Sequence, residues 1–270
     1  MRITEKQILI AILLLGALLR FWGLGSAEFF HDEGFYAFRS VGYLDYLQSD
    51  DQTTPIQWFK DGDLPFWTSL SFHDAPPLFF LVQNFFFRIF GDSLFAARLP
   101  SALAGIASIY LVYLLGKRFF QSERTGQLVG ILAALLLAVN HIHIWISRSS
   151  LLESLQIFLI LLNIYYFFVF LENPKKWKMF GLTLGLAFLA KYTSGFLAQV
   201  YGAYLLIFKR DLLKKRELYL TLALAVILFS PVFIYNFYLY QAVGHFDLQF
   251  AYLFGQEIKS VCSFLLYGKI

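Results

Sequence analysis

Three short clusters of ionisable side chains have the types and spacing that group-transfer chemistry needs. In chain order they are Asp32 with Glu33, His73 with Asp74, and Arg148 with Glu153. A fourth candidate, Lys191, stands alone between two apolar stretches. Carboxylates can deprotonate an acceptor hydroxyl or hold a metal ion, while Arg and Lys can bind a phosphate leaving group. These residues would form a transferase site if the fold brings them together.

Each cluster taken alone also has a simpler explanation. Asp32 and Glu33 can be acids at a helix start, where the helix dipole favours negative charge. The segment before Pro76 can be a helix cap, because Pro suits the first helical turn, and Arg148 with Glu153 can be an ion pair at a membrane boundary. A single shared site is favoured by the membrane topology, since the order of the apolar spans puts all these residues on the same face of the membrane.

The composition requires lipid as the solvent for much of this chain. Hydrophobic residues make up 59% of the 270 residues and charged residues only 15%, which is more apolar side chain than a soluble domain of this size can bury. Apolar runs long enough to cross the bilayer lie at Ile8–Leu24, Leu94–Gly116, Gln127–Ile146, Leu152–Leu171 and Leu218–Tyr240. We therefore predict an all-α polytopic membrane protein.

A shorter pair of apolar stretches lies between Met179 and Phe208 and is interrupted by turn-forming residues at Lys191–Gly195. At 1.5 Å per residue each stretch is only about 20 Å long, so the connection should lie below the membrane surface. Counting both, we expect seven full spans, with Lys191 lining a wet cavity.

Charge asymmetry predicts the orientation. Ten of the 18 acidic residues but only three of the 22 basic residues lie in 25–93. The alternate connections, by contrast, are basic; their Lys and Arg residues are Lys117, Arg118, Arg124, Lys175, Lys176, Lys178, Lys209, Arg210, Lys214, Lys215 and Arg216. The positive-inside rule makes these loops cytoplasmic, so 25–93 is an outer loop. We find no nucleic-acid signature, because the basic residues follow a membrane-topology pattern.

The run Leu78–Phe90 is apolar but contains Gln83, Asn84 and Arg88. Crossing the membrane here would invert every later loop and expose the basic residues outside. We therefore predict an interfacial helix that lies along the outer surface.

The two ends of the chain support further expectations. Residues 2–24 resemble a signal peptide, but no convincing small-residue cleavage site follows Gly25, so we expect the first helix to be retained. We assign 1–240 to a transmembrane catalytic module, and 241–270 to an outer loop followed by the start of a further, truncated membrane segment at Ser260–Ile270.

The order of these motifs resembles the GT-C glycosyltransferases of the protein-mannosyltransferase, aminoarabinose-transferase and rhizobial lipopolysaccharide sugar-transferase (Rgt-like) type. The resemblance covers roughly Ile8 to Phe208. The motifs that carry it are Asp32-Glu33, Pro76-Pro77-Leu78, the segment Phe90–Ser101, Ser147-Arg148 with Glu153, and Gly181–Lys191. Five motifs in the same order are more specific than any one of them.

The resemblance implies a GT-C type transmembrane bundle with interfacial helices in its outer loop, located in the inner cell membrane with its active site on the outer face. It implies inverting transfer from a polyprenyl-phosphate sugar to a lipid, glycan or protein acceptor. Asp32 would be the base or orient the acceptor, Glu33 would support it or hold a cation, and Glu153 would take the place of the second acid. Tyr36 is a candidate substrate-binding residue.

Two departures from the family pattern affect the roles. Several relatives carry Lys directly before the Pro-Pro pair, where this chain has Ala75, so donor phosphate must be bound by other residues. The candidates are Arg148, Lys191 and, third, His73. Asp74 matches an acid that some relatives place near a metal, which allows for a divalent metal ion but no other cofactor.

Three alternatives remain open at this point. A polytopic transporter or polyprenyl-lipid flippase would also need charges in a membrane cavity, but it should place them mid-span. A non-catalytic scaffold and an inactive transferase fragment are the others. A metal site at His141 and His143 is disfavoured, because residues two apart on a helix do not share a face.

Overall fold

The computed structural model describes residues 4–30, 32–42, 65–120 and 122–256, and every regular element in these ranges is a helix. The α-helices are α1 (Glu5–Phe21), α2 (Asp32–Val41), α3 (Leu78–Phe90), α4 (Leu94–Phe119), α5 (Glu123–Val139), α6 (His141–Arg148), α7 (Leu152–Glu172), α8 (Trp177–Ala190), α9 (Phe196–Phe208), α10 (Arg216–Val243) and α11 (Leu248–Leu253). Short 3-10 helices are η3 (Phe66–Ser69), η4 (Pro174–Lys176), η5 (Tyr192–Gly195) and η6 (Arg210–Lys214). The predicted all-α class is confirmed.

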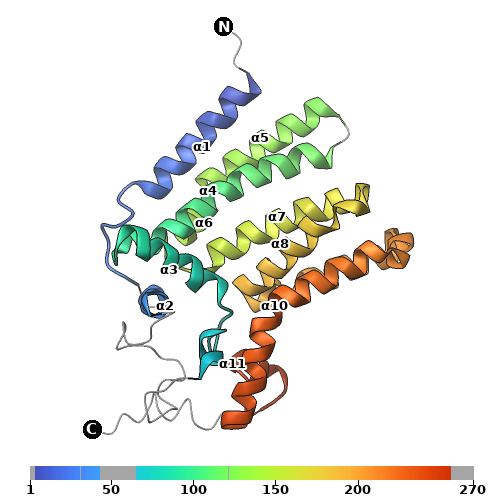
Figure 1. The fold of residues 1–270 in the computed structure, drawn as a ribbon. Coiled ribbons are helices and arrows are strands. Elements are labelled where there is room, and N and C mark those ends of the chain that lie inside the picture. The colour runs from blue at the N-terminus through green and yellow to red at the C-terminus, as the bar shows by residue number, and fades with distance from the viewer. Residues whose placement is uncertain (1–3, 31, 43–64, 121, 257–270) are drawn as a thin grey trace.

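The long helices lie side by side in one bundle (Figure 1). Helix α4 packs against α1, α5 and α7, and α8 packs between α7 and α10. Because consecutive helices alternate in direction, the basic connections α4–α5 and α7–α8 and the start of α10 gather at one end, which we call the basic end. Helices α2, α3 and α11 and the α6–α7 connection lie at the opposite, outer-loop end.

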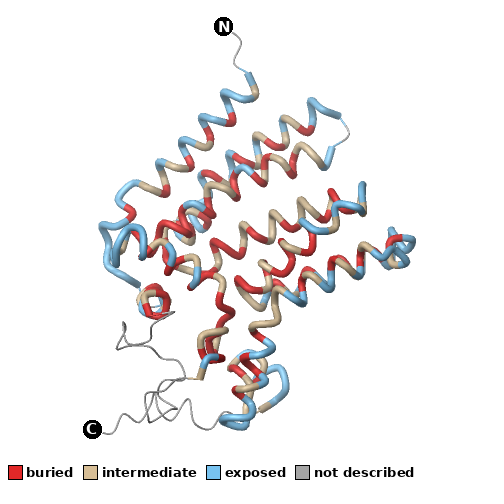
Figure 2. The backbone as a smooth tube through the Cα atoms, viewed as in Figure 1, coloured by how far each residue is buried: buried red, intermediate tan, exposed pale blue. Residues whose placement is uncertain are grey.

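The faces of the bundle that point outward are apolar. Large aliphatic side chains are more than half exposed on α1 (Leu14, 66%), α5 (Leu136, 68%) and α10 (Ile227, 65%), and Figure 2 shows exposed residues recurring along the bundle helices. An apolar surface spread over several helices would be costly in water. The surroundings of this bundle are therefore lipid.

Three described helices are long and apolar enough to cross a membrane, namely α4, α7 and α10, and a fourth span results if the bent pair α5–α6 counts as one. Helices α1, α8 and α9 have 17, 14 and 13 residues. The expectation of seven full spans is therefore too high for the described helices, because three of the expected segments are short.

The span expected at Gln127–Ile146 is not one straight helix, since the chain bends by 60° between α5 and α6. Asn140 has an extended backbone, and its side chain accepts a hydrogen bond from the His143 amide (2.9 Å), so it caps α6. The fully buried Arg20 of α1 donates to the carbonyls of Leu137 (3.3 Å) and Ala138 (3.1 Å). These contacts satisfy carbonyls that the interrupted helix leaves without helical partners.

The expected helical hairpin at 179–208 is present. Two glycines of α8 allow this helix to pack closely against α10. A Cβ at Gly181 would lie 2.8 Å from the Thr221 carbonyl, and one at Gly185 would lie 2.8 Å from Leu228. Small residues allow such close helix packing in membranes. Helix α8 then ends at Ala190, with Lys191 as its extended C-cap before η5.

Helix α3 has the bounds that the sequence predicts, Leu78–Phe90. It packs against α2, α4 and α8 at the outer-loop end. The depth of α3 in a membrane stays a prediction, as does the division at residue 240. The expected membrane segment at Ser260–Ile270 lies outside the described residues.

Candidate active site

One face of α2 presents three polar side chains toward the outer-loop end of the bundle. Asp32, Tyr36 and Arg39 follow one another at helical spacing. The half-buried ring of Tyr36 packs edge-on against Phe79 and Phe80 of α3, at 6.3 and 5.6 Å between ring centroids. The Arg39 guanidinium forms an ion pair with Asp74 (2.6 Å).

The Tyr36 hydroxyl lies within the electrostatic influence of carboxylates from three chain segments. Burial raises the pKa of Tyr36, and the negative charges of Asp32, Asp74 and Glu153 raise it further, while Arg39 opposes them. Such charges act strongly only over short distances at a partly buried site. The fold thus brings three sequence-predicted acids close enough to one phenol for their charges to act on it.

Asp32 and Glu33 are neighbours in sequence but have different surroundings. Asp32 is exposed at the first position of α2 and makes no hydrogen bond with the described residues. Glu33 is buried, and its Oε1 accepts from Arg98 Nε (2.9 Å) and the Ser150 amide (2.7 Å). Asp32 is therefore available to a substrate, whereas Glu33 is held inside the protein.

The other oxygen of Glu33 is equally occupied. Oε2 accepts from Arg98 Nη2 (3.0 Å) and from the Phe30 amide (3.0 Å). Burial alone would raise the pKa of Glu33, but these donors, Arg98 first, lower it below the usual value. Because the anion is fully hydrogen-bonded, this geometry favours the supporting role over cation binding.

Glu153 and Lys191 form the second pair of the site. Lys191 Nζ lies 2.5 Å from Glu153 Oε1, and each side chain is about one third exposed (34% and 36%). The other carboxylate oxygen, Oε2, is buried and has no hydrogen-bond partner among the described residues. The pair joins the first turn of α7 to the end of α8.

The side chain of Arg148, the last residue of α6, contacts the C-terminal end of α1. Its Nη1 donates to the carbonyls of Leu19 (3.0 Å) and Trp22 (2.6 Å). Those carbonyls belong to the last turn of α1, where helical partners end. The contacts of Arg148 are thus with backbone, and they do not include Lys191 or Glu153.

His73 is buried beside the site and in contact with its neighbours. Its ring packs edge-on against His245 (5.7 Å), and its carbonyl accepts from the Leu248 amide (2.7 Å). Burial lowers the pKa of His73 to about 4, and His245 and Arg39 also lower it, while Asp74 raises it. A neutral imidazole at this position is a poor partner for a phosphate.

The described residues offer little support for a metal centre. They contain no group of three or more His, Cys, Asp or Glu side chains that could hold a metal ion, and Asp74 is already paired with Arg39. His143 contacts Arg20 Nη2 (2.7 Å), while His141 is exposed. The described residues thus assemble no set of metal ligands; a divalent metal ion at Asp74 stays a prediction, and the reaction proposed below uses none.

Residues 241–256 close one side of the site. The buried Asp247 accepts from the Tyr192 hydroxyl (2.8 Å) and from Asn236 (3.0 Å), and it caps α11 through the Phe250 amide (2.9 Å). Burial raises the pKa of Asp247. This network anchors the residue next to Lys191, and the sequence analysis did not single it out.

Sequence reasoning also missed Arg39 and Arg98 as site residues. Arg39 is one of only three basic residues in the acidic segment 25–93, and it lies three positions after Tyr36, which was a usable signal. Arg98 was part of a recognised motif, but its partner is 65 residues away. That pairing depends on the packing of α4 against the α1–α2 connection.

Comparison with known proteins identifies relatives. The family model described as dolichyl-phosphate-mannose-protein mannosyltransferase matches residues 74–235. A protein of Bacillus subtilis (strain 168) named Putative mannosyltransferase YycA is 31% identical over 157 residues, or 57% of this chain and 22% of the relative. Putative mannosyltransferase YkcB of the same strain is 28% identical over 157 residues, or 57% and 21%.

A further relative is an uncharacterized protein of Aquifex aeolicus (strain VF5), 28% identical over 239 residues, or 86% of this chain and 44% of the relative. No solved structure matches the chain. The matched segment spans about a fifth of the length of the two Bacillus proteins.

Proposed function

The chain belongs to the dolichyl-phosphate-mannose-protein mannosyltransferase family, and from that premise we propose that it is a glycosyltransferase with the site described above. It moves a sugar from a polyprenyl-phosphate donor to a lipid, glycan or protein acceptor of the cell envelope. The reaction takes place on the outer face of the cell membrane.

The observation that supports this proposal is that the charges of Asp32, Asp74 and Glu153, which come from three separate chain segments, all act on the Tyr36 hydroxyl. The chemistry needs a carboxylate for the acceptor and a cation for the leaving phosphate, close together. Asp32 is an exposed carboxylate, and Lys191 is a partly exposed cation bound to Glu153. Both belong to the outer-loop end, away from the basic connections (Figure 1).

Asp32 is the general base in the proposed reaction. It takes the proton of the acceptor hydroxyl while that oxygen attacks the anomeric carbon of the sugar. The bond from this carbon to the phosphate oxygen breaks, and the electron pair leaves with the polyprenyl phosphate. Attack from the side opposite the leaving group inverts the anomeric configuration. Tyr36, next to Asp32 on the same face of α2, is placed to donate a hydrogen bond to the sugar.

Lys191 stabilises the negative charge that develops on the leaving phosphate. A phosphate oxygen can compete with Glu153 for the Lys191 ammonium, because the side chains of both residues are about one third exposed. Ion pairs that are exposed to solvent in this way contribute little free energy. Glu153 keeps Lys191 in place when donor is absent. Glu33 and Arg98 hold the start of α2 so that Asp32 faces the site.

Two measurements test this function. Envelope glycans from cells with and without the protein are compared by mass spectrometry, and we expect one glycosylated species to disappear in its absence. The purified chain in lipid nanodiscs is then incubated with radiolabelled polyprenyl-phosphate mannose and envelope extract. Label that remains entirely on the donor, with an unchanged glycan profile in cells, would refute the proposal. The flippase alternative is tested separately in proteoliposomes, where labelled donor that crosses the membrane without transfer would support it.

A further inference from the structure

The turn that carries Lys191 is attached to α7 through its second half. It comprises residues 191–195, between the end of α8 and the start of α9, and we call it the 191–195 turn. Gln156 of α7 donates through Nε2 to the hydroxyls of Thr193 (2.8 Å) and Ser194 (3.0 Å). These hydrogen bonds hold the part of the turn that is farther along the chain from Lys191.

Tyr192, the residue next to Lys191, is attached to α10 and α11 instead. Its hydroxyl donates to Asp247 Oδ2 (2.8 Å). Its ring packs against Phe229 of α10 and Phe250 of α11, at 6.0 and 5.4 Å between ring centroids. The first half of the 191–195 turn therefore depends on the α10–α11 segment for its position.

Asp247 is itself held firmly. It is fully buried, and its Oδ2 also accepts from Asn236 Nδ2 of α10 (3.0 Å). Its Oδ1 accepts from the Phe250 amide (2.9 Å) at the start of α11, and its own amide donates to Asn236 Oδ1 (2.8 Å). Buried polar networks of this kind rigidify the segments that they join. The Tyr192 hydroxyl is thus bound to a fixed acceptor.

Donor binding makes this attachment important for Lys191. In the proposed reaction a phosphate oxygen competes with Glu153 for the Lys191 ammonium, so the bound donor weakens the ion pair that otherwise holds the side chain. The position of Lys191 then depends on the backbone of the 191–195 turn, and Tyr192 is its direct neighbour. A binding group that is already held in place loses less conformational entropy when its ligand arrives.

We propose that Asp247 is a positioning residue for Lys191 and acts through the Tyr192 hydroxyl. The inference rests on the proposed function, because it requires that Lys191 binds the donor phosphate. It adds that the segment 241–256, which closes one side of the site, contributes to donor affinity.

The main test is the donor KM and the kcat of Tyr192→Phe, measured in nanodiscs with polyprenyl-phosphate mannose. Phe keeps the ring between Phe229 and Phe250 and removes only the hydroxyl that binds Asp247. Donor KM should rise about 3- to 10-fold, as expected for one lost hydrogen bond, and kcat at saturating donor should change little. A merely damaged protein would instead show a lower kcat with an unchanged donor KM, and that result would overturn the proposal.

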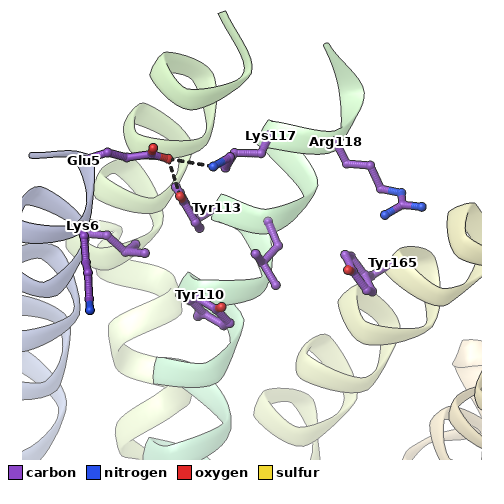
Figure 3. A pocket seen from close by; sticks show the side chains of 9 residues that line it. Glu5, Lys6, Tyr110, Tyr113, Lys117, Arg118 and Tyr165 are labelled. Atoms are coloured by element: carbon purple, nitrogen blue, oxygen red, sulfur yellow. Dashed lines mark hydrogen bonds and ion pairs between the residues drawn. The ribbon is translucent and has the colours of Figure 1, made fainter. Parts of the chain in front are cut away.

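Tyr113 of α4 supplies a matched control at the basic end of the bundle. Its hydroxyl donates to Glu5 of α1, whose carboxylate also lies 3.1 Å from Lys117 Nζ. Figure 3 shows these three side chains together, in the cavity between α1, α4 and α7. Tyr113→Phe therefore removes a tyrosine–carboxylate hydrogen bond beside a lysine, but at the end of the bundle opposite Lys191. Its donor KM should equal that of wild type, and an increase as large as that in Tyr192→Phe would overturn the proposal.

Double-mutant cycles test whether Asp247 acts through Tyr192 and Lys191. Asp247→Asn keeps a side chain that can cap α11 but replaces the carboxylate that accepts from Tyr192. Donor KM should rise in this variant, and adding Tyr192→Phe should raise it no further. In a Lys191→Ala background, Tyr192→Phe should leave donor KM unchanged. Losses that add independently in either cycle would overturn the proposed route.

The result for Lys191 separates this inference from the proposed function. A wild-type donor KM in Lys191→Ala would overturn both, because Lys191 would then not bind the phosphate. An increased donor KM in Lys191→Ala, together with a wild-type value in Tyr192→Phe, would overturn only the role of Asp247. Increases in both variants that are coupled in the cycle would support the proposal.

Discussion

Arg98 of α4 holds Glu33 of α2 through both carboxylate oxygens, with Nε to Oε1 at 2.9 Å and Nη2 to Oε2 at 3.0 Å. The same guanidinium donates to the carbonyls of Leu24, Ala27 and Glu28. It therefore closes the α1–α2 connection, and the Ser150 amide bound to Glu33 adds the α6–α7 connection. One buried ion pair fixes the segments that carry Asp32 and Glu153.

Arg98→Ala should destabilise the fold strongly. The change leaves the Glu33 carboxylate buried without its cation, and breaking a buried pair in this way costs about 3–5 kcal/mol. Thermal unfolding in detergent measures the effect. Glu172→Gln is the control, because it removes an ion-pair partner at an exposed position and should cost about 1 kcal/mol or less. Similar midpoints for Arg98→Ala and wild type would show that the pair is not structural.

Asp32→Asn should remove activity while leaving the fold intact. Asn keeps the size of the side chain but cannot take a proton, so transfer should fall by about 10²- to 10⁴-fold. Stability should change little, since Asp32 is exposed and makes no hydrogen bond with described residues. Glu28→Gln, an exposed carboxylate of the same segment, is the control and should transfer normally. Full turnover by Asp32→Asn would shift the base to another carboxylate.

Lys191→Ala should mainly weaken donor binding, whereas Arg148→Ala should mainly lower the stability of the fold. Loss of a charge-assisted contact to phosphate should raise the donor KM of Lys191→Ala about 10- to 100-fold, with partial recovery in Lys191→Arg. Arg148→Ala removes the donor to the carbonyls of Leu19 and Trp22. It should lower the thermal midpoint and change donor KM less. A larger donor KM effect in Arg148→Ala would place Arg148 on the phosphate.

Protonation of the buried His73 should make the folded protein less stable in mild acid. Its folded pKa, about 4, lies below the ordinary value of 6.5, so between these pH values the unfolded chain binds a proton that the folded chain does not. The contribution of neutral His73 to the free energy of unfolding is therefore present near neutral pH, and it is lost as pH falls from about 6.5 toward 4. The neighbours that set this shift are His245, Asp74 and Arg39.

The comparison that tests this is the thermal midpoint at pH 7 and pH 5. The wild type should lose more stability on acidification than His73→Gln, which cannot titrate. His141→Gln, at an exposed position, should behave like wild type. Identical pH dependence in His73→Gln and wild type would exclude His73 as the group responsible.

Cysteine labelling checks the orientation. With Cys262 replaced by Ser, a cysteine at Lys176 of the basic end should be protected from an impermeant reagent in intact cells. A cysteine at Glu28 should react, because the outer-loop end faces outside. Labelling at position 176 with protection at 28 would invert the topology and move the candidate site to the cytoplasmic face.

The fold class, the main helices and the family could all be predicted from the amino-acid sequence alone. Apolar runs predicted α4, α7 and α10, and the shorter run Leu78–Phe90 predicted α3 with its observed bounds. These features are local, since hydropathy and turn chemistry are properties of consecutive residues. The order of the motifs along the chain predicted the family that the comparisons show.

Which of the candidate site residues contact one another depends on how distant helices pack. Asp32 and Glu33 look equivalent in sequence, yet only Glu33 turns inward to Arg98 of α4, 65 residues away. Likewise, Arg20 of α1 donates to the carbonyls of Leu137 and Ala138 next to the bend at Asn140. Hydropathy could not predict either result, because the free energy of a buried charge depends on partners that only the packing of distant helices supplies.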